Sequence, residues 1–432
     1  MKYVSTRGAA PAVGLKTALL AGLAPDGGLY MPGELPPLDP AFLEELGSRS
    51  LAEIGTVVSE PFVDRLTAGE RARLAEETLD FEIPLLEIGD GIWVLELFHG
   101  PTLAFKDVGA RFMARLMTRW AGGDPRPLTV LTATSGDTGG AVAQAFAGLA
   151  GVRVAVLYPR GKVSPLQEKQ FTTLGGNIQA LAVAGDFDDC QQLAKEAFRD
   201  DTLRAELRLT SANSINIGRL LPQMFYYFQA VARLPEGSGP PLFSTPSGNF
   251  GNLTAGLMAR VLGLPCHGIV AATNINDAVP RFLVDGRYRP RRARSTLSNA
   301  MDVGDPSNFE RMKWLFDDDV GRMRGVIWGS RHDDDETTRV MRRVHAEHGY
   351  LLDPHTAVGY LGLRQKLAAL PQPTPGVVLA TAHPAKFRDE IEPLLGLRLE
   401  LPERLRRSLE LDSRALEIPA TLDALASFLR GW

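Results

Sequence analysis

The feature of this sequence that most constrains its fold is a repeated order of apolar strand, glycine-containing turn and helix, which begins near Trp93. Strands that alternate with helices in this way favour a mostly parallel sheet with crossover helices. The pattern therefore predicts an α/β fold. The predicted strands are 128–132, 152–158, 178–183, 242–244, 268–272 and 377–381, and the predicted helices are 141–149, 164–174, 187–198, 253–262, 308–315 and 336–347.

The length of 432 residues exceeds what one hydrophobic core usually organises, so we expect two packed lobes. Residues 1–90 combine amphipathic stretches at 43–51 and 71–79 with Pro and Gly breaks, which predicts a mainly helical segment. Residues 91–240 and 241–432 are then the two lobes. Their boundaries are defined to within about ten residues, and the chain is free to cross between the lobes.

Composition excludes several classes of protein. No apolar run is long enough to cross a bilayer, and the start has no basic-then-apolar signal pattern, so we expect no membrane association. A net charge of −4 gives no general attraction to nucleic acid, and the arginines of 287–294 form a solvated loop. Cys190 and Cys266 are too few for a disulfide framework, which favours a reducing compartment, so we expect a cytoplasmic protein. Neither these cysteines nor His99 and His383 have the spacing of metal ligands, so we expect no metal.

Lys106 lies between an apolar strand and a helix, after the Gly100-Pro101 turn. Lysine has an ordinary pKa of about 10.4, so it acts as a nucleophile only in apolar or cationic surroundings, which Phe98 and Phe105 can supply. Taken alone, Lys106 beside Asp107 is more simply a solvated lysine at a helix start. Its neighbouring motifs change that interpretation.

Two loops are suited to anions. In 247–252 (Ser-Gly-Asn-Phe-Gly-Asn), glycines let main-chain N–H groups converge at a helix start, where a phosphate binds favourably. In 133–139, hydroxyls and amides can bind a carboxylate or a phosphate. The plainer alternatives are a structural turn for the first loop and a helix capped by Asp137 or Thr138 for the second.

A third polar stretch, 211–219, places Asn213, Ser214 and Arg219 at the start of a helix, where they can share one ligand. Helix capping and a surface ion pair are the alternatives. Taken together, a lysine able to form a Schiff base, a glycine loop for phosphate, a hydroxyl loop for carboxylate and an α/β frame are what pyridoxal 5'-phosphate chemistry requires.

The sequence also resembles the threonine synthase family in its longer-chain branch. The stretches that carry the resemblance are 96–112, 132–140, 211–221, 247–256 and 381–387, with further similar stretches between them, and Asn252 stands where relatives can carry an acidic residue. The resemblance implies a fold type II pyridoxal-phosphate enzyme, similar to tryptophan synthase β, with the cofactor between two α/β lobes.

The resemblance further implies a role for each motif. Lys106 would form the Schiff base and transfer protons, and Thr381 would hydrogen-bond the pyridine nitrogen of the cofactor. The cofactor phosphate would be bound by Gly248, Asn249, Phe250, Gly251 and Asn252. The substrate carboxylate would be bound by Ser135, Asp137 and Thr138, and the leaving phosphate by Asn213, Ser214 and Arg219.

The reaction implied is the conversion of O-phospho-L-homoserine and water to L-threonine and phosphate, by a monomer or a homodimer. A serine/threonine dehydratase-like lyase is the alternative, because it would use the same lysine and glycine loop without a second phosphate site. A sensor that binds the cofactor without catalysis is a further alternative. Arg219 distinguishes the two enzymes.

Overall fold

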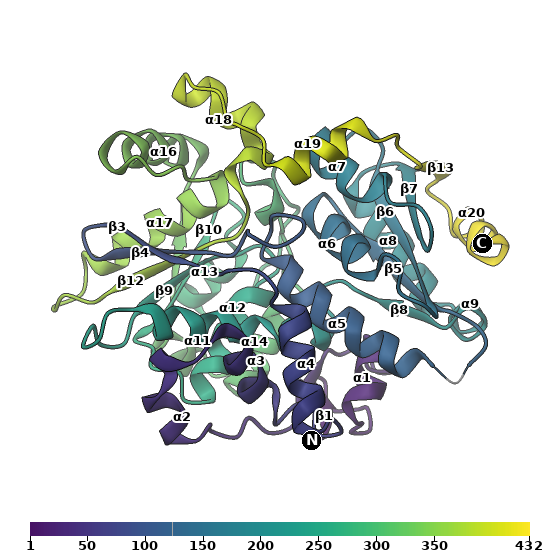
Figure 1. Cartoon of the computed structure of the whole chain (residues 1–432), viewed down its shortest axis with the longest axis horizontal. Helices are drawn as coiled ribbons and strands as arrows, with labels where there is room; N and C mark the ends of the chain where they lie inside the picture. The colour runs from purple at the N-terminus through teal and green to yellow at the C-terminus, as the bar shows by residue number, and fades with distance from the viewer. Residues whose placement is uncertain (123) are drawn as a thin grey trace. The chain divides into compact units, whose positions relative to one another are not determined.

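The computed structural model describes residues 1–122 and 124–432 and divides the chain into two units. The first unit contains residues 31–105 and 220–400, together with Met1. The second unit contains residues 2–30, 106–219 and 401–432. Each unit is built around its own β-sheet (Figure 1).

The sheet of the first unit has six strands in the order β11-β10-β9-β12-β4-β3. Neighbouring strands are parallel except for the hairpin of β3 and β4. Strand β12 lies between β9 and β4, with Val378 opposite both Ser244 and Val94. The strands are β3 (Leu85–Gly89), β4 (Ile92–Glu96), β9 (Leu242–Pro246), β10 (Gly268–Thr273), β11 (Ile327–Arg331) and β12 (Gly376–Ala380).

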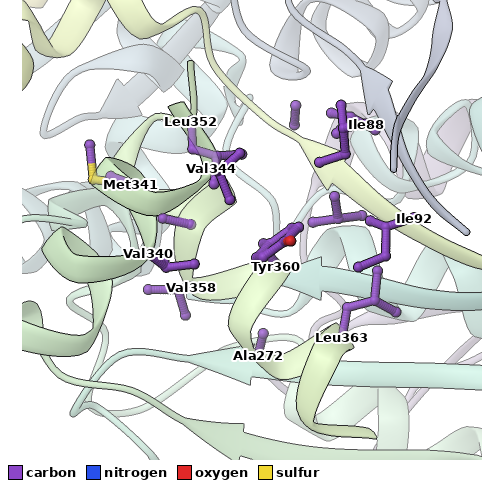
Figure 2. Close-up of a cluster of buried hydrophobic side chains, with 14 of the residues drawn as sticks. Ile88, Ile92, Ala272, Val340, Met341, Val344, Leu352, Val358, Tyr360 and Leu363 are labelled. Carbon is purple, nitrogen blue, oxygen red and sulfur yellow. The ribbon is translucent and has the colours of Figure 1, made fainter. Parts of the chain in front are cut away.

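Helices pack around this sheet and complete the core of the first unit. Figure 2 shows apolar side chains of α16 and α17 gathered with Ile88 and Ile92 of the β3–β4 hairpin. The helices are α2 (Pro40–Glu44), α3 (Leu51–Ser59), α4 (Ala68–Thr78), α11 (Gln223–Arg233), α12 (Gly251–Val261), α13 (Ala278–Asp285), α14 (Phe309–Leu315), α15 (Val320–Arg324), α16 (Asp334–His348), α17 (Pro354–Leu367) and α18 (Arg388–Leu395), with 3-10 turns η1 (Leu46–Ser48), η2 (Asn299–Met301) and η3 (Pro384–Phe387).

The sheet of the second unit is entirely parallel, in the order β13-β7-β6-β5-β8. The strands are β5 (Leu128–Ala133), β6 (Val152–Pro159), β7 (Ile178–Ala184), β8 (Leu209–Ser211) and β13 (Leu416–Pro419). The helices are α1 (Leu15–Ala21), α5 (Lys106–Ala121), α6 (Asp137–Phe146), α7 (Pro165–Thr172), α8 (Phe187–Arg199), α9 (Asp201–Leu207), α19 (Glu403–Glu410) and α20 (Leu422–Gly431). Strands β1 (Tyr3–Ser5) and β2 (Tyr30–Pro32) and helix α10 (Ile217–Leu220) are short.

The predicted α/β fold with mostly parallel strands is confirmed, and every strand predicted from the sequence is present within two residues. The amphipathic stretch 43–51 covers the end of α2, the turn η1 and the start of α3. Ser50 begins a new helix there, because its hydroxyl accepts from the Glu53 N–H while the Glu53 side chain accepts from the Ser50 N–H. Strands β1, β2, β3, β8, β11 and β13 were not predicted.

The two units are divided differently from the segments 1–90, 91–240 and 241–432 that the sequence suggested. Residues 92–96 belong with the first unit because their ladder partner is β12. Residues 401–432 belong with the second unit because β13 pairs with β7. In the described part of the chain, no helix has the length and apolar character needed to span a membrane.

Candidate functional site

Lys106 is the first residue of α5, directly after a connection that is fixed to the end of β12. The Phe105 N–H donates to the Thr381 carbonyl oxygen at 2.9 Å, and the His383 N–H donates to the Leu103 carbonyl at 3.1 Å. Leu103 has a φ of +58°, the left-handed conformation needed for the tight turn before the helix. The start of α5, and with it Lys106, is thereby defined by main-chain bonds.

The ammonium of Lys106 faces a buried carboxylate within the second unit. Its Nζ lies 3.7 Å from Asp137 Oδ2, and the side chains of Lys106 and Asp137 are 18% and 4% exposed. The other oxygen of Asp137 accepts a hydrogen bond of 2.9 Å from Gln167 Nε2. Gln167 lies so close to Gly136 that a Cβ there would come within 2.7 Å of the Gln167 carboxamide. Gly136 therefore allows Gln167 to hold Asp137 toward the lysine.

The loop before α6 is organised by Thr134. Its hydroxyl accepts from the N–H groups of Gly136 and Gly139 at 2.9 and 2.8 Å, so Thr134, and neither Asp137 nor Thr138, satisfies the helix start. The hydroxyls of Ser135 and Thr138 are partly exposed and make no hydrogen bond with residues 1–122 or 124–432. Two hydroxyls at this loop are therefore available to a ligand.

Asn213 joins the carboxyl ends of β8 and β5. Its Oδ1 accepts from Thr132 Oγ1 and from the Ala133 N–H, and its Nδ2 donates to the Ala133 carbonyl at 2.8 Å. Arg219 is buried and donates from Nη1 to the Ala212 carbonyl at 2.7 Å. Ser214 lies between them and is partly buried. The amide of Asn213 is thus committed to the strand ends.

The glycine loop of the first unit presents its main chain to a ligand. The N–H groups of Gly248, Asn249 and Phe250 donate to none of the described residues. Phe250 has a φ of +60° and stands directly before α12, which begins at Gly251. A Cβ at Gly248 would lie 2.7 Å from the Ala300 carbonyl oxygen and 3.0 Å from the Cα of Met301. Gly248 is therefore required by the close approach of the 299–301 turn.

Asn252 occupies the first turn of α12 and is buried. Its Oδ1 accepts from the hydroxyls of Tyr226 and Tyr227 at 2.7 and 3.0 Å. Burial raises the pKa of Tyr227, so its hydroxyl stays protonated and remains a donor. The Nδ2 of Asn252 is buried and has no partner among the described residues. An orphaned donor at a helix start suits an anion.

Thr381 follows the last residue of β12 and is 7% exposed. Its carbonyl oxygen accepts from the Phe105 N–H, whereas its hydroxyl makes no hydrogen bond with the residues that the structure describes. The hydroxyl is available to a nitrogen or oxygen of a ligand.

The predicted site residues fall into two groups. The second unit contains Lys106, Ser135, Asp137, Thr138, Asn213, Ser214 and Arg219, and the first unit contains Gly248, Asn249, Phe250, Gly251, Asn252 and Thr381. The structure brings Lys106 and Asp137 together. Sequence reasoning missed Gln167, Thr134 and the two tyrosines. Of these, only Thr134 carried a signal, as a hydroxyl three residues before α6.

Family models cover nearly the whole chain. Residues 80–382 match the model of pyridoxal-phosphate dependent enzymes, residues 2–78 match the threonine synthase N terminus, and residues 356–429 match the threonine synthase C-terminal model. The chain belongs to the threonine synthase family. The cofactor of this family is pyridoxal phosphate, and threonine synthesis is the activity of this chain.

Curated relatives agree over their full length. The threonine synthase of Serratia marcescens is 46% identical, over 97% of this chain and 96% of the relative. That of Escherichia coli K12 is also 46% identical, over 96% of both. The threonine synthase of Pseudomonas aeruginosa is 36% identical over 99% of this chain.

Solved structures agree in fold as well. The crystal structure of threonine synthase from Escherichia coli matches with a TM-score of 0.93 and 44% identity over all of both chains. The structure of threonine synthase from Brucella melitensis with bound pyridoxal phosphate matches with a TM-score of 0.94 and 38% identity, over 100% of this chain and 99% of that one.

The residues of this chain fit pyridoxal phosphate. The three main-chain donors of Gly248, Asn249 and Phe250 and the orphaned Nδ2 of Asn252 suit its phosphate. The amine of Lys106 is of the kind that can form a Schiff base, and the hydroxyl of Thr381 is of the kind that can hydrogen-bond a ring nitrogen.

Proposed function

We propose that this chain converts O-phospho-L-homoserine and water to L-threonine and inorganic phosphate, the last step of threonine biosynthesis. The observation that carries the proposal is Lys106, the first residue of α5, which is paired with the buried carboxylate of Asp137. The preceding residue, Phe105, donates its main-chain N–H to the Thr381 carbonyl. Bound pyridoxal phosphate withdraws electrons from the substrate's amino-bearing carbon, which makes the hydrogen of that carbon removable. The protein then has to move protons and hold two anionic groups.

Four elements would hold the cofactor. Lys106 would carry it covalently, the loop Gly248–Asn252 would bind its phosphate, and the Thr381 hydroxyl would hydrogen-bond its ring nitrogen. A hydroxyl does not stabilise a protonated ring as a carboxylate would, so electron withdrawal is moderated. Moderation suits a reaction that continues beyond the α-carbon.

Lys106 would act as the base once its amine is released by the substrate. A neutral Nζ can accept the Cα proton and, once that proton has been passed on, a Cβ proton. It can then return protons to Cγ, which becomes the methyl carbon of threonine, and to Cα after water adds at Cβ. Loss of the γ-phosphate takes the C–O bond electrons with it, and water supplies the hydroxyl of threonine. Asp137, held by Gln167, keeps the amine directed between these transfers.

The hydroxyls of Ser135 and Thr138 would bind the substrate carboxylate, together with nearby main-chain N–H groups. They carry no charge and have no other partner in the described part of the chain. We assign Asp137 to this end of the substrate only through Lys106, because two carboxylates in direct contact repel each other.

Ser214 and Arg219 would bind the leaving phosphate, a dianion that needs charge-assisted donors. Arg219 is the cation of the 211–219 stretch, and it is held through Nη1 by the Ala212 carbonyl. Asn213 would contribute by fixing the strand ends that present this stretch, since its amide already binds Ala133 and Thr132.

The test compares two substrates on the purified enzyme. Phosphate release from O-phospho-L-homoserine, with threonine formed in equal amount, is the expected result. Deamination of serine or threonine at a higher kcat/KM than phosphohomoserine turnover would instead favour the dehydratase-like lyase. Arg219→Ala, which removes the cation assigned to the leaving phosphate, should depress the first reaction and leave any deamination unchanged.

We further infer a cytoplasmic protein, because Cys190 and Cys266 are free thiols and Cys190 is buried. For partners we propose the small-molecule substrate and at most a second copy of the chain, that is, a monomer or a homodimer. Sedimentation of the pure protein tests the number of copies. A species larger than two chains would contradict it.

A further inference from the structure

The glycine loop packs against the turn η2, whose residues Ala300 and Met301 lie next to Gly248. A Cβ on Gly248 would approach the Ala300 carbonyl oxygen to 2.7 Å and the Val303 Cγ2 to 3.3 Å. Contacts this close leave the loop no room to move toward the turn. The η2 turn therefore limits the loop on this side, in addition to the bonds that Asn249 accepts from the Ser307 and Asn308 N–H groups.

The turn is held by His355. The Ala300 N–H donates to His355 Nε2 at 3.1 Å. An N–H can donate only to a ring nitrogen that carries no hydrogen, so Nε2 is unprotonated and the ring hydrogen lies on Nδ1. That Nδ1 lies 2.8 Å from Asp353 Oδ1, which accepts its hydrogen. The bond to Ala300 thus requires a neutral imidazole in one tautomer.

Asp353 is fixed more firmly than a surface carboxylate. It is 1% exposed and is the N-cap of α17, where it accepts from the N–H groups of His355 and Thr356 and from the Thr356 hydroxyl. His355 is 3% exposed. The ring also contacts Phe387, with centroids 4.9 Å apart, in the η3 turn that follows Thr381.

The far side of the η2 turn is held by Asp302. Its Oδ1 accepts from Asn274 Nδ2, Asn276 Nδ2 and Thr296 Oγ1, and its Oδ2 accepts from the Thr296 N–H. These bonds anchor 296–302 to the carboxyl end of β10. They do not reach Ala300, whose N–H has His355 as its partner.

We propose that His355, oriented by Asp353, is a positioning residue for the cofactor-phosphate loop. His355 fixes the position of Ala300, and Ala300 together with Met301 limits the position of Gly248. The main-chain N–H groups of 248–250 are thereby oriented before any ligand binds. The proposal rests on the assignment of this loop to the cofactor phosphate. No part of His355 needs to touch the cofactor or the substrate.

The experiment measures dissociation constants of the cofactor-free enzyme for pyridoxal phosphate and for pyridoxal, which lacks the phosphate. His355→Leu removes the acceptor, and His355→Gln is the matched control, because its Oε1 can accept from Ala300. We expect His355→Leu to weaken pyridoxal phosphate about tenfold, the effect of leaving a buried N–H unpaired. His355→Gln should stay within about threefold of the wild type, and pyridoxal affinity should be unchanged in both.

Gly248→Ala separates the two levels of the proposal. It should also weaken pyridoxal phosphate selectively, because its Cβ displaces the loop from the η2 turn. If Gly248→Ala leaves the ratio of the pyridoxal phosphate affinity to the pyridoxal affinity unchanged, the assignment of the loop to the cofactor phosphate fails. If Gly248→Ala lowers the ratio and His355→Leu does not, only the role of His355 fails.

Circular dichroism of the cofactor-free variants shows whether His355 only positions the loop or supports the fold of the whole unit. We expect a cofactor-free His355→Leu protein that folds and has a far-ultraviolet circular dichroism spectrum like the wild type. Equal weakening of pyridoxal and pyridoxal phosphate, or failure of the variant to fold, would show that His355 supports the unit as a whole and would overturn the proposal.

Discussion

The main-chain N–H of Phe105 donates to the carbonyl oxygen of Thr381 at 2.9 Å. Phe105 directly precedes the lysine, and Thr381 carries the hydroxyl assigned to the ring nitrogen of the cofactor. One main-chain bond therefore links the residue before Lys106 to Thr381. Because it uses no side-chain atom, both side chains can be changed without breaking it.

Lys106→Ala should abolish turnover and the visible absorption of the bound cofactor. A positioned proton-transfer group contributes up to about 10⁴-fold, and the covalent link is lost as well. Absorption spectra and phosphate release measure both effects. Lys106→Arg keeps the charge beside Asp137 but cannot form the link, so it should be equally colourless after dialysis. A coloured, active Lys106→Arg enzyme would contradict the assignment.

Thr381→Val should lower kcat without unfolding the protein. The substitution replaces the hydroxyl by a methyl group of nearly the same shape and preserves the main-chain bond from Phe105. A neutral hydrogen bond contributes about 1 kcal/mol, or about fivefold in rate. Thr381→Ser restores the hydroxyl and should restore most of the rate. Steady-state kinetics at saturating cofactor provide the comparison, and equal rates for Val and Ser would dismiss the hydroxyl.

Arg219→Ala should reduce kcat/KM for phosphohomoserine about 10- to 100-fold, because a hydrogen bond to a charged group contributes about 1.5–3 kcal/mol. Arg219→Lys keeps the charge but loses the planar fork, so it should fall between. Cofactor absorption serves as the folding control, and it should be normal in both. Unchanged kinetics with normal absorption would remove Arg219 from the phosphate site.

Asn252→Asp should weaken pyridoxal phosphate by about tenfold or more, since it replaces the orphaned donor with a carboxylate oxygen near a phosphate. The oxygen that accepts from Tyr226 and Tyr227 is retained, so the fold should persist. Equilibrium titration of the cofactor-free enzyme measures the change. Tyr226→Phe is the control that disturbs the same residue without adding charge. Wild-type affinity in Asn252→Asp would mean that Nδ2 points elsewhere.

Asp302 makes stability depend on pH. Burial raises its pKa from 3.8 to about 6, so between pH 4 and 6 the folded state binds a proton that the unfolded chain has lost. Its contribution to the unfolding free energy therefore falls by about 2 kcal/mol as pH rises through this window and is constant above it. Urea unfolding of Asp302→Asn, compared with wild type across pH 4–7, should lack this decline. A parallel pH dependence in both proteins would contradict it.

The sequence predicted what is encoded in contiguous stretches. The lysine motif and glycine loop could be recognised because each combines its reactive groups within a few residues at a strand end. Gln167 and Asp137 are thirty positions apart, and His355 and Ala300 fifty-five, so only the folded sheets bring them together. Local chemistry also differs where side chains compete, since Thr134 takes the capping role that the plainer alternative gave to Asp137 or Thr138.

Strand β13 escaped prediction for a different reason. Its residues 416–419 are mostly exposed at a sheet edge, so they show no apolar run, and their strand conformation depends on pairing with β7. The two-unit division was hidden for the same reason, since strand pairing decides which distant segments belong together.

Strand order also dictates when this molecule can be completed during synthesis on the ribosome. β4 emerges early, yet its neighbour β12 is made some 280 residues later, and β9 waits for the same strand. Until residue 380 leaves the exit tunnel, the hairpin of β3 and β4 has no ladder partner on its open side. A nascent chain halted before that point therefore leaves the edges of β4 and β9 without their ladder partner, and unpaired strand edges of this kind are prone to aggregation.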